Sequence, residues 1–217
     1  MGFGYPVLLE LAGRRCLVVG ARAVREGKVE GLLDAGADDV AVIAEGPPTR
    51  LDVLERDPRI RVERRGWRPS DLDGAFLVVG WCRDPRDRDR LAAEARARGA
   101  LVNVIDDVPG CDFAAPAVVR RGELIIAIGT GGASPALARK LREELEVGFG
   151  PHWAELAELL REVRSLVSPL LPDLAERSRR WQAALDLAEA ERLVRERRGE
   201  ELRQELIRRL VGTEVPA

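Results

Sequence analysis

The residues with the clearest chemical potential follow an apolar run at positions 101–105. Asn103 lies inside this run, and two adjacent carboxylates, Asp106 and Asp107, come directly after it. A carboxylate in a preorganised pocket can act as a general base or orient a substrate. Ligands of open α/β sheets sit at the carboxyl ends of the strands, so a candidate site is expected here if the run is a strand. The plain alternative is that the acidic pair only ends a strand.

A glycine-rich stretch follows a second apolar run, at positions 124–128. It leads into Ser134 and Pro135, an N-cap residue followed by a proline suited to the first position of a helix. The backbone amides of such a stretch would point toward an incoming anion. We therefore expect a substrate with several carboxylates to bind at Thr130, Gly131, Gly132, Ala133 and Ser134.

The composition argues against several classes of function. The chain has 217 residues and a formal net charge of -2, which gives no electrostatic case for binding nucleic acid or an anionic membrane. No apolar run approaches the ~20 residues of a membrane span, so a cytoplasmic protein is expected. Three cysteines without paired spacing and one histidine argue against a disulfide framework and a protein-ligated zinc or iron site. Any metal would then arrive with the substrate.

Strand-like and helix-like segments alternate through the first half of the chain. Apolar runs predict strands over 16–20, 38–44, 75–80 and 101–105. Residues 60–64 alternate apolar and charged side chains, as an edge or half-exposed strand does. Helical spacing predicts helices over 21–35 and 87–99, and Pro-Ser-Asp at 69–71 signals a further helix start. The opening series of strand, helix and strand is a dinucleotide-binding unit. The predicted fold class is therefore α/β, a Rossmann-like doubly wound parallel sheet.

The turn after the first strand departs from the usual glycine fingerprint. A Gly-x-Gly-x-x-Gly pattern starting at Gly20 would place glycines at the positions of Arg22 and Arg25. The second glycine normally lets the backbone approach a pyrophosphate, so Arg22 would crowd it. Arg22 could instead give phosphate a charge-assisted contact, or it could face water beside a decayed pocket. Glu45, just after the second strand, could accept a hydrogen bond from a ribose hydroxyl, although a lone exposed Glu commonly has no role.

The second half of the chain predicts a hairpin and a set of helices. Apolar runs on either side of 120–123 predict a hairpin. A two-stranded hairpin cannot bury both of its faces alone, so we expect it to pack against a second copy of the chain. Helices are expected over 136–146, 151–170, 173–187 and 188–211. Their leucine spacing is short and interrupted, which favours a small helical subdomain over a coiled coil. The predicted domains are a Rossmann-like dinucleotide-binding domain over 1–113, a dimerisation segment over 114–147 and a helical domain over 148–217.

Several motifs, in this order, resemble the signature of one family. They are Asn-Val-Ile-Asp-Asp at 103–107, Cys-Asp-Phe at 111–113 with Pro116, and Thr-Gly-Gly-Ala-Ser-Pro-Ala-Leu-Ala-Arg at 130–139. The chain thus resembles the precorrin-2 dehydrogenase / sirohydrochlorin ferrochelatase family, the amino-terminal module of siroheme synthase. The resemblance runs from about Pro6 to Leu145. Few other families carry both the aspartate motif and the glycine-rich motif in this order.

The resemblance implies an NAD-dependent precorrin-2 dehydrogenase, an oxidoreductase of siroheme and porphyrin biosynthesis that forms sirohydrochlorin. Insertion of ferrous iron into sirohydrochlorin, a ferrochelatase activity, also belongs to the family. The family's first aspartate after the fifth strand carries the chemistry, which implies Asp106 as catalytic residue and Asp107 as second candidate. A homodimer and a cofactor loop containing Trp81, as a lid or as a packed aromatic, are also implied. The candidate cofactor-binding residues are Gly20, Ala21, Arg22, Ala23, Val24, Glu45, Trp81 and Asn103.

The first loop departs from the family pattern. That loop usually begins with three glycines and ends in Arg-Lys. Gly20 and Lys28 remain here, but four positions differ, namely Ala21, Arg22, Arg25 and Gly27. Two alternatives therefore stay open beside the dehydrogenase: a chelatase that no longer binds nicotinamide, and a non-catalytic tetrapyrrole-binding protein. A titration with NAD separates them.

Overall fold

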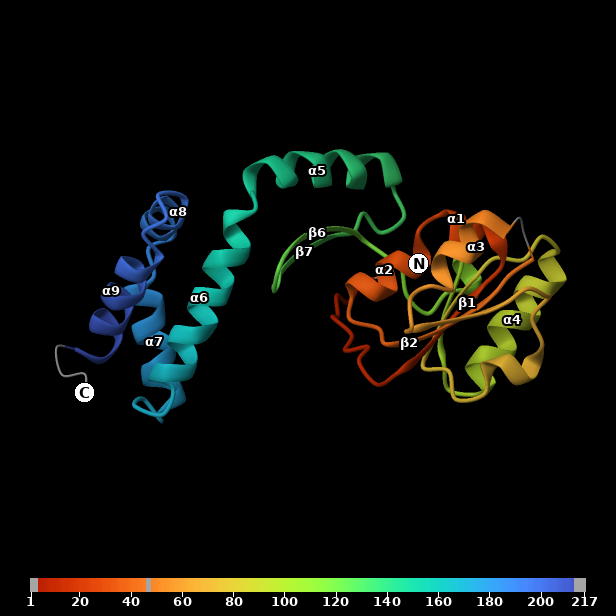
Figure 1. Ribbon diagram of the computed structural model, residues 1–217, viewed down its shortest axis with the longest axis horizontal. Coiled ribbons are helices and arrows are strands. Elements are labelled where there is room, and N and C mark those ends of the chain that lie inside the picture. The colour runs from red at the N-terminus through yellow and green to blue at the C-terminus, as the bar shows by residue number, and fades with distance from the viewer. Residues whose placement is uncertain (1–3, 46–47, 213–217) are drawn as a thin grey trace. The chain divides into compact units, whose positions relative to one another are not determined.

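The computed structural model describes residues 4–45 and 48–212. The chain divides into two compact units, with the boundary between Ala115 and Pro116. The first unit holds a five-stranded sheet and the second a two-stranded sheet followed by helices (Figure 1). The aspartate motif belongs to the first unit, and the glycine-rich motif belongs to the second.

All strands of the first unit are parallel, in the order β3-β2-β1-β4-β5. Their bounds are β1 Arg15–Val19, β2 Asp39–Ile43, β3 Ile60–Glu63, β4 Leu77–Gly80 and β5 Leu101–Val104. Apart from Arg15 and Asp39 at the first positions of β1 and β2, the central strands β1, β2 and β4 are apolar, as is typical of strands covered on both faces. The alternating strand β3 lies at the edge, as its pattern predicts.

Helices cover both faces of this sheet. The helices of the first unit are α1 Ala21–Arg25, α2 Lys28–Asp34, α3 Pro48–Leu54 and α4 Pro85–Ala97, with short 3-10 helices η1 Pro69–Leu72 and η2 Val108–Gly110. Val18 of β1 belongs to one core cluster with residues of α1 and α2, whereas the neighbouring Leu17 belongs to another with Leu91 of α4. Each such buried side chain contributes roughly 1.5–3 kcal/mol to stability. The predicted doubly wound α/β fold is confirmed.

The strand order places a switch point between β1 and β4. From β1 the chain proceeds to one side of the sheet, through β2 and β3, and then returns to the other side through β4 and β5. Parallel strands end at the same edge, so the residues that follow β1, β4 and β5 meet there. These residues are Gly20, Trp81 and the segment that contains Asp106.

Two helices that were each predicted as continuous are split for local reasons. The helix expected over 21–35 is split into α1 and α2, because Gly27 adopts a left-handed φ of 73° that ends one helix and begins the next. The helix expected over 188–211 is likewise split, into α8 Leu187–Arg195 and α9 Gly199–Val211, around Arg197 with φ 58°. Helix α3 was not expected at all, although its Leu51 and Leu54 are buried in the core.

The second unit combines a hairpin with a helical core. Strands β6 Ala117–Arg121 and β7 Leu124–Ile128 pair antiparallel, as predicted, and α5 Pro135–Gly148, α6 His152–Val167 and α7 Leu174–Ala184 precede α8 and α9. Arg121 ties the hairpin to the end of α5, because its Nε donates to the Phe149 carbonyl at 2.6 Å. Leu206 and Leu210 of α9 are fully buried among the helices. Over residues 4–45 and 48–212, no helix is long and apolar enough to cross a membrane.

Candidate active site

The turn after β1 is clamped against the end of β4. Gly20 has φ 90°, and its amide donates to the Ile43 carbonyl at 2.8 Å. The Trp81 amide donates to the Val19 carbonyl at 2.9 Å. A Cβ atom at position 20 would lie 2.1 Å from the Trp81 carbonyl oxygen. Only glycine therefore fits this close approach of two backbones.

Arg22 lies on α1 and reaches across the sheet edge. Its Nη1 atom is 2.6 Å from Oδ2 of Asp106, and its Nε is 2.7 Å from Oε1 of Glu26, one turn along the helix. The guanidinium carbon lies 5.7 Å from the centroid of the Trp81 ring. The pKa of Arg22 is raised above its usual value, first by the hydrogen bond to Glu26 and further by the charge of Asp106. Arg22 is therefore neither buried nor simply facing water.

The two adjacent aspartates differ in direction. Asp106 follows directly after Ile105, whose amide still pairs with β4 through the Gly80 carbonyl at 2.9 Å. The Asp106 side chain is 57% exposed and faces Arg22. The Asp107 carboxylate is turned into the following bend, since a Cβ on Gly110 would be 2.5 Å from its Oδ2. Of the two candidate carboxylates, only Asp106 contacts the residues after β1.

The Cys-Asp-Phe motif folds back along β5 and accepts hydrogen bonds from backbone amides of this edge strand. Asp112 accepts the Val102 amide through Oδ2 at 3.0 Å, and Cys111 Sγ lies 3.2 Å from the Val104 amide. Asn103 Nδ2 donates to the Phe113 carbonyl at 2.8 Å. Burial raises the pKa of the Cys111 thiol. The motif residues therefore fix the end of β5, which in turn fixes the place of Asp106.

The remaining cofactor candidates are spread along the same edge. Ala23 and Val24 are buried in the core, so they can offer a ligand only backbone atoms, and Ala21 packs against the same cluster. Glu45 is exposed just after β2. Trp81 is partly buried, and it packs against the core on the face that α1 and α2 cover.

The glycine-rich loop of the second unit is held by its own hydrogen bonds. Thr130 Oγ1 accepts the Ser134 amide at 3.2 Å, and the Ala133 amide donates to the Thr130 carbonyl at 3.0 Å. Ser134 caps α5, because its Oγ accepts the Leu137 amide at 3.1 Å. Gly131 and Gly132 adopt φ values of 61° and 85°. The predicted N-cap is confirmed, and the Ala133 amide, one of those expected to face an anion, is used inside the loop.

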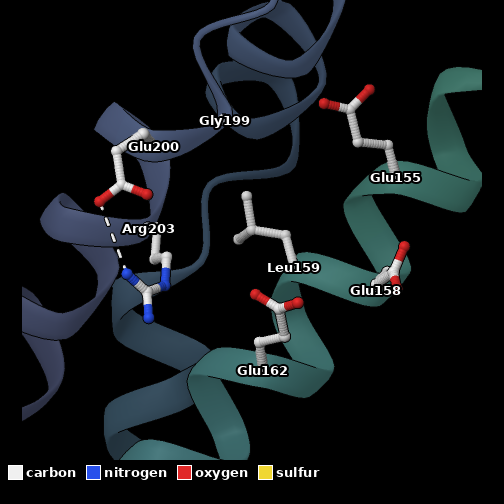
Figure 2. A pocket seen from close by; sticks show the side chains of 7 residues that line it. All are labelled: Glu155, Glu158, Leu159, Glu162, Gly199, Glu200 and Arg203. Atoms are coloured by element: carbon white, nitrogen blue, oxygen red, sulfur yellow. Dashed lines mark ion pairs between the residues drawn. The ribbon is translucent and has the colours of Figure 1, made fainter.

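An acidic cleft of about 230 Å³ lies elsewhere in the second unit, between α6 and α9. Figure 2 shows Leu159 pointing into the space between the two helices, with the Glu200–Arg203 ion pair on the α9 side. The cleft contains none of the predicted site residues; the residues that line it are Glu155, Glu158, Leu159, Glu162, Gly199, Glu200 and Arg203. Within the described ranges of the chain, no group of three or more His, Cys, Asp or Glu side chains is arranged to hold a metal ion.

The edge of the first unit fits a dinucleotide. Gly20 lets the turn after β1 lie directly against Trp81, and Arg22 places a cation on that turn, where phosphates bind in doubly wound sheets. The exposed Glu45 carboxylate stands at the end of β2, where a ribose hydroxyl acceptor is expected. No local pattern in the sequence indicates the pairing between Arg22 and Asp106, although the four-residue spacing of Arg22 and Glu26 could have indicated their ion pair.

Family models match both units. Residues 7–117 match a family described as "Putative NAD(P)-binding", and residues 121–147 match one described as "Sirohaem biosynthesis protein central". The first match alone covers half of the chain.

Relatives and a solved structure agree with these matches. Siroheme synthase of Chromobacterium violaceum is 36% identical over 182 residues, and that of Pseudomonas entomophila 37% over 187 residues. These alignments cover 84% and 86% of this chain but only 38% and 40% of the relatives, so the chain spans about two fifths of their length. A solved structure of "SirC, precorrin-2 dehydrogenase" superposes with a TM-score of 0.67 and 27% identity, over 94% of this chain and 98% of that one. The chain therefore belongs to the family of the siroheme synthase amino-terminal module and SirC.

Proposed function

We propose that this protein oxidises precorrin-2 to sirohydrochlorin in siroheme biosynthesis, with NAD as the hydride acceptor. The observation that carries this proposal is the agreement with SirC over 98% of that chain, which includes both units. Dehydrogenation removes a hydride and a proton from the tetrapyrrole. The nicotinamide takes the hydride when NAD is bound, so the protein has to orient the substrate and accept the proton.

Asp106 is the proposed proton acceptor. It lies at the carboxyl end of β5, is half exposed, and faces the turn after β1 that would hold the nucleotide. Asp107 is the weaker candidate, because its carboxylate lies against Gly110. Asn103 acts indirectly in this proposal, by holding Phe113 and with it the end of the strand. The loop at 130–134 is proposed to bind the substrate carboxylates through the amides of Gly131 and Gly132.

NAD rather than NADP is proposed because of Glu45. Its exposed carboxylate follows β2, where an acidic residue accepts from the ribose hydroxyls of NAD and repels the additional phosphate of NADP. The nearby Arg65 is committed to Asp71, through bonds of 2.8 and 2.7 Å, so it is not free to bind that phosphate.

A second candidate function, that of a chelatase, is supported by the two ion pairs that Arg22 already makes. This side chain stands at the second glycine position and is already paired with two carboxylates. A chelatase that inserts ferrous iron into sirohydrochlorin needs no nicotinamide, and Asp106 could still accept pyrrole protons. A non-catalytic tetrapyrrole-binding protein would bind the tetrapyrrole but would catalyse neither the oxidation nor the iron insertion.

Titration of the purified protein with NAD, monitored by tryptophan fluorescence, distinguishes the dehydrogenase from the chelatase and from the non-catalytic tetrapyrrole-binding protein. Saturable binding together with NAD-dependent oxidation of precorrin-2 is the expected result. Iron insertion without NAD binding would identify the chelatase, and tetrapyrrole binding without either reaction would identify the non-catalytic protein. NADP titrated in parallel should bind more weakly, because it adds a phosphate beside Glu45.

A homodimer built on the hairpin and α5 is also proposed. No residue of β7 is fully buried, and Leu137, Leu141 and Val147 of α5 are 50%, 36% and 83% exposed. A two-stranded sheet is marginal alone, and a second copy would cover these apolar side chains.

Sedimentation at micromolar concentration is expected to show a dimer that Leu137→Asp dissociates. Leu187→Asp is the matched control, since Leu187 is 55% exposed and both residues lie in the first turn of a helix. Aspartate is well tolerated in a first turn, so neither change should unfold its helix. A wild-type monomer, or equal dissociation by both variants, would contradict this interface.

A further inference from the structure

Arg22 connects the nucleotide turn to the proposed proton acceptor. It is the residue where a glycine would normally admit a pyrophosphate, and its Nη1 atom is held by Asp106 at 2.6 Å. Its Nε is held by Glu26 on the same helix at 2.7 Å. The Trp81 ring lies beside the same guanidinium, at 5.7 Å. Residues that follow β1, β4 and β5 therefore meet at one cation.

The backbone of Asp106 adopts a conformation that is uncommon for a residue other than glycine. Its φ is 62°, in the left-handed region, and within the described segments only Arg197 is a second non-glycine residue with a positive φ. Aspartate tolerates this region better than most residues, yet such a conformation persists only where the surrounding structure enforces it. A turn around Asp106 supplies part of that constraint, because the Asp107 amide donates to the Val104 carbonyl at 3.1 Å, and the fold-back of Cys111, Asp112 and Phe113 holds the end of β5.

The ion pair itself is exchangeable. The side chains of Arg22 and Asp106 are 34% and 57% exposed, so water competes for both groups. Exposed pairs of this kind are usually worth less than about 1 kcal/mol. A pyrophosphate carries more charge than one carboxylate and can accept two hydrogen bonds from the same guanidinium. The pair is therefore weak enough for a nucleotide to displace.

We propose that Arg22 is a positioning residue that couples nucleotide binding to the release of Asp106. This inference rests on the proposed NAD-dependent function. Without nucleotide, Arg22 occupies the Asp106 carboxylate. When the nucleotide phosphates take over Nη1 of Arg22, Asp106 is left free to accept a proton from the substrate. Arg22 thus replaces the missing glycine and also makes the proton acceptor available only when the cofactor is present.

The coupling has a thermodynamic consequence for the free protein. If the phosphates and Asp106 compete for Arg22, each weakens the binding of the other by the same factor. Removal of the Asp106 charge should therefore tighten NAD binding, and only while Arg22 is present. The expected gain is up to about fivefold, which corresponds to the worth of an exposed ion pair.

A double-mutant cycle with calorimetric titration of NAD tests this coupling. The proteins are wild type, Asp106→Asn, Arg22→Gln and the double variant. Asparagine suits the left-handed region at least as well as aspartate, so Asp106→Asn removes the charge and keeps the backbone. Asp106→Gly is a second variant that removes the charge, and glycine adopts φ 62° without strain. Both Asp106 variants should bind NAD more tightly, and the gain should vanish in the Arg22→Gln background.

Asp107→Asn is the matched control. It removes the same charge one residue along the chain, but its carboxylate faces Gly110 rather than Arg22. Its NAD affinity should equal that of wild type. A gain in this control, or an equal gain from Asp106→Asn with and without Arg22, would show a general charge effect and overturn the coupling alone. Absence of saturable NAD binding in all these proteins would instead overturn the proposed dehydrogenase function, and the coupling with it.

Discussion

Asp106→Asn is expected to lower the rate of precorrin-2 oxidation by about 10²-fold or more, as for the loss of a general base. The amide cannot accept the substrate proton, yet it retains the size of the side chain and the left-handed backbone at φ 62°. The measurement is kcat under saturating NAD and precorrin-2, with circular dichroism to show that the fold is intact. NAD binding should be retained or tightened, so the loss should appear in kcat rather than in the KM for NAD.

The matched variant is Asp107→Asn, whose carboxylate lies in the bend with Gly110. Its kcat should fall far less than that of Asp106→Asn. Wild-type rates for Asp106→Asn, in both oxidation and iron insertion, would remove this residue from the mechanism. A larger loss in Asp107→Asn would exchange the proposed roles of the two aspartates.

Gly20→Ala is expected to destabilise the protein by about 3 kcal/mol or more, through two additive terms. Gly20 combines φ 90° with ψ 142°, a conformation near the region found essentially only in glycine, and a side chain there costs about 1–3 kcal/mol. In addition, the new Cβ would lie 2.1 Å from the Trp81 carbonyl oxygen, so the turn after β1 would have to separate from β4. Urea unfolding followed by circular dichroism measures the change.

Gly36→Ala is the control for a positive φ without a clash. Gly36 has φ 88°, close to the 90° of Gly20, but a Cβ there would meet no atom within 4 Å. Its loss of stability should stay near the roughly 1–2 kcal/mol of backbone strain alone. Equal losses of unfolding free energy for both variants would show that the turn after β1 can move away from the Trp81 carbonyl without cost. NAD affinity should fall only in Gly20→Ala, because only that turn is proposed to face the phosphates.

Local patterns in the sequence determined the elements of this protein. Apolar runs bounded by glycine predicted the parallel strands, and Ser134 with Pro135 predicted the start of α5, because strand burial and helix capping depend on neighbouring residues. The motif residues also indicated the family that the comparisons show. The broken helices were missed because a glycine such as Gly27 is tolerated inside a helix as well as at its end, and because Arg197 carries no sequence signal for a positive φ.

Only the tertiary structure decided which side chains meet at the site. The family resemblance ranked Asp106 before Asp107, but only the structure shows that the Asp107 carboxylate lies against Gly110 while that of Asp106 faces Arg22. Arg22 and Asp106 are distant in the chain, and they meet because β1, β4 and β5 are parallel neighbours in one sheet whose strands end at a common edge. The register of those strands depends on packing across both faces of the sheet, which no local pattern encodes.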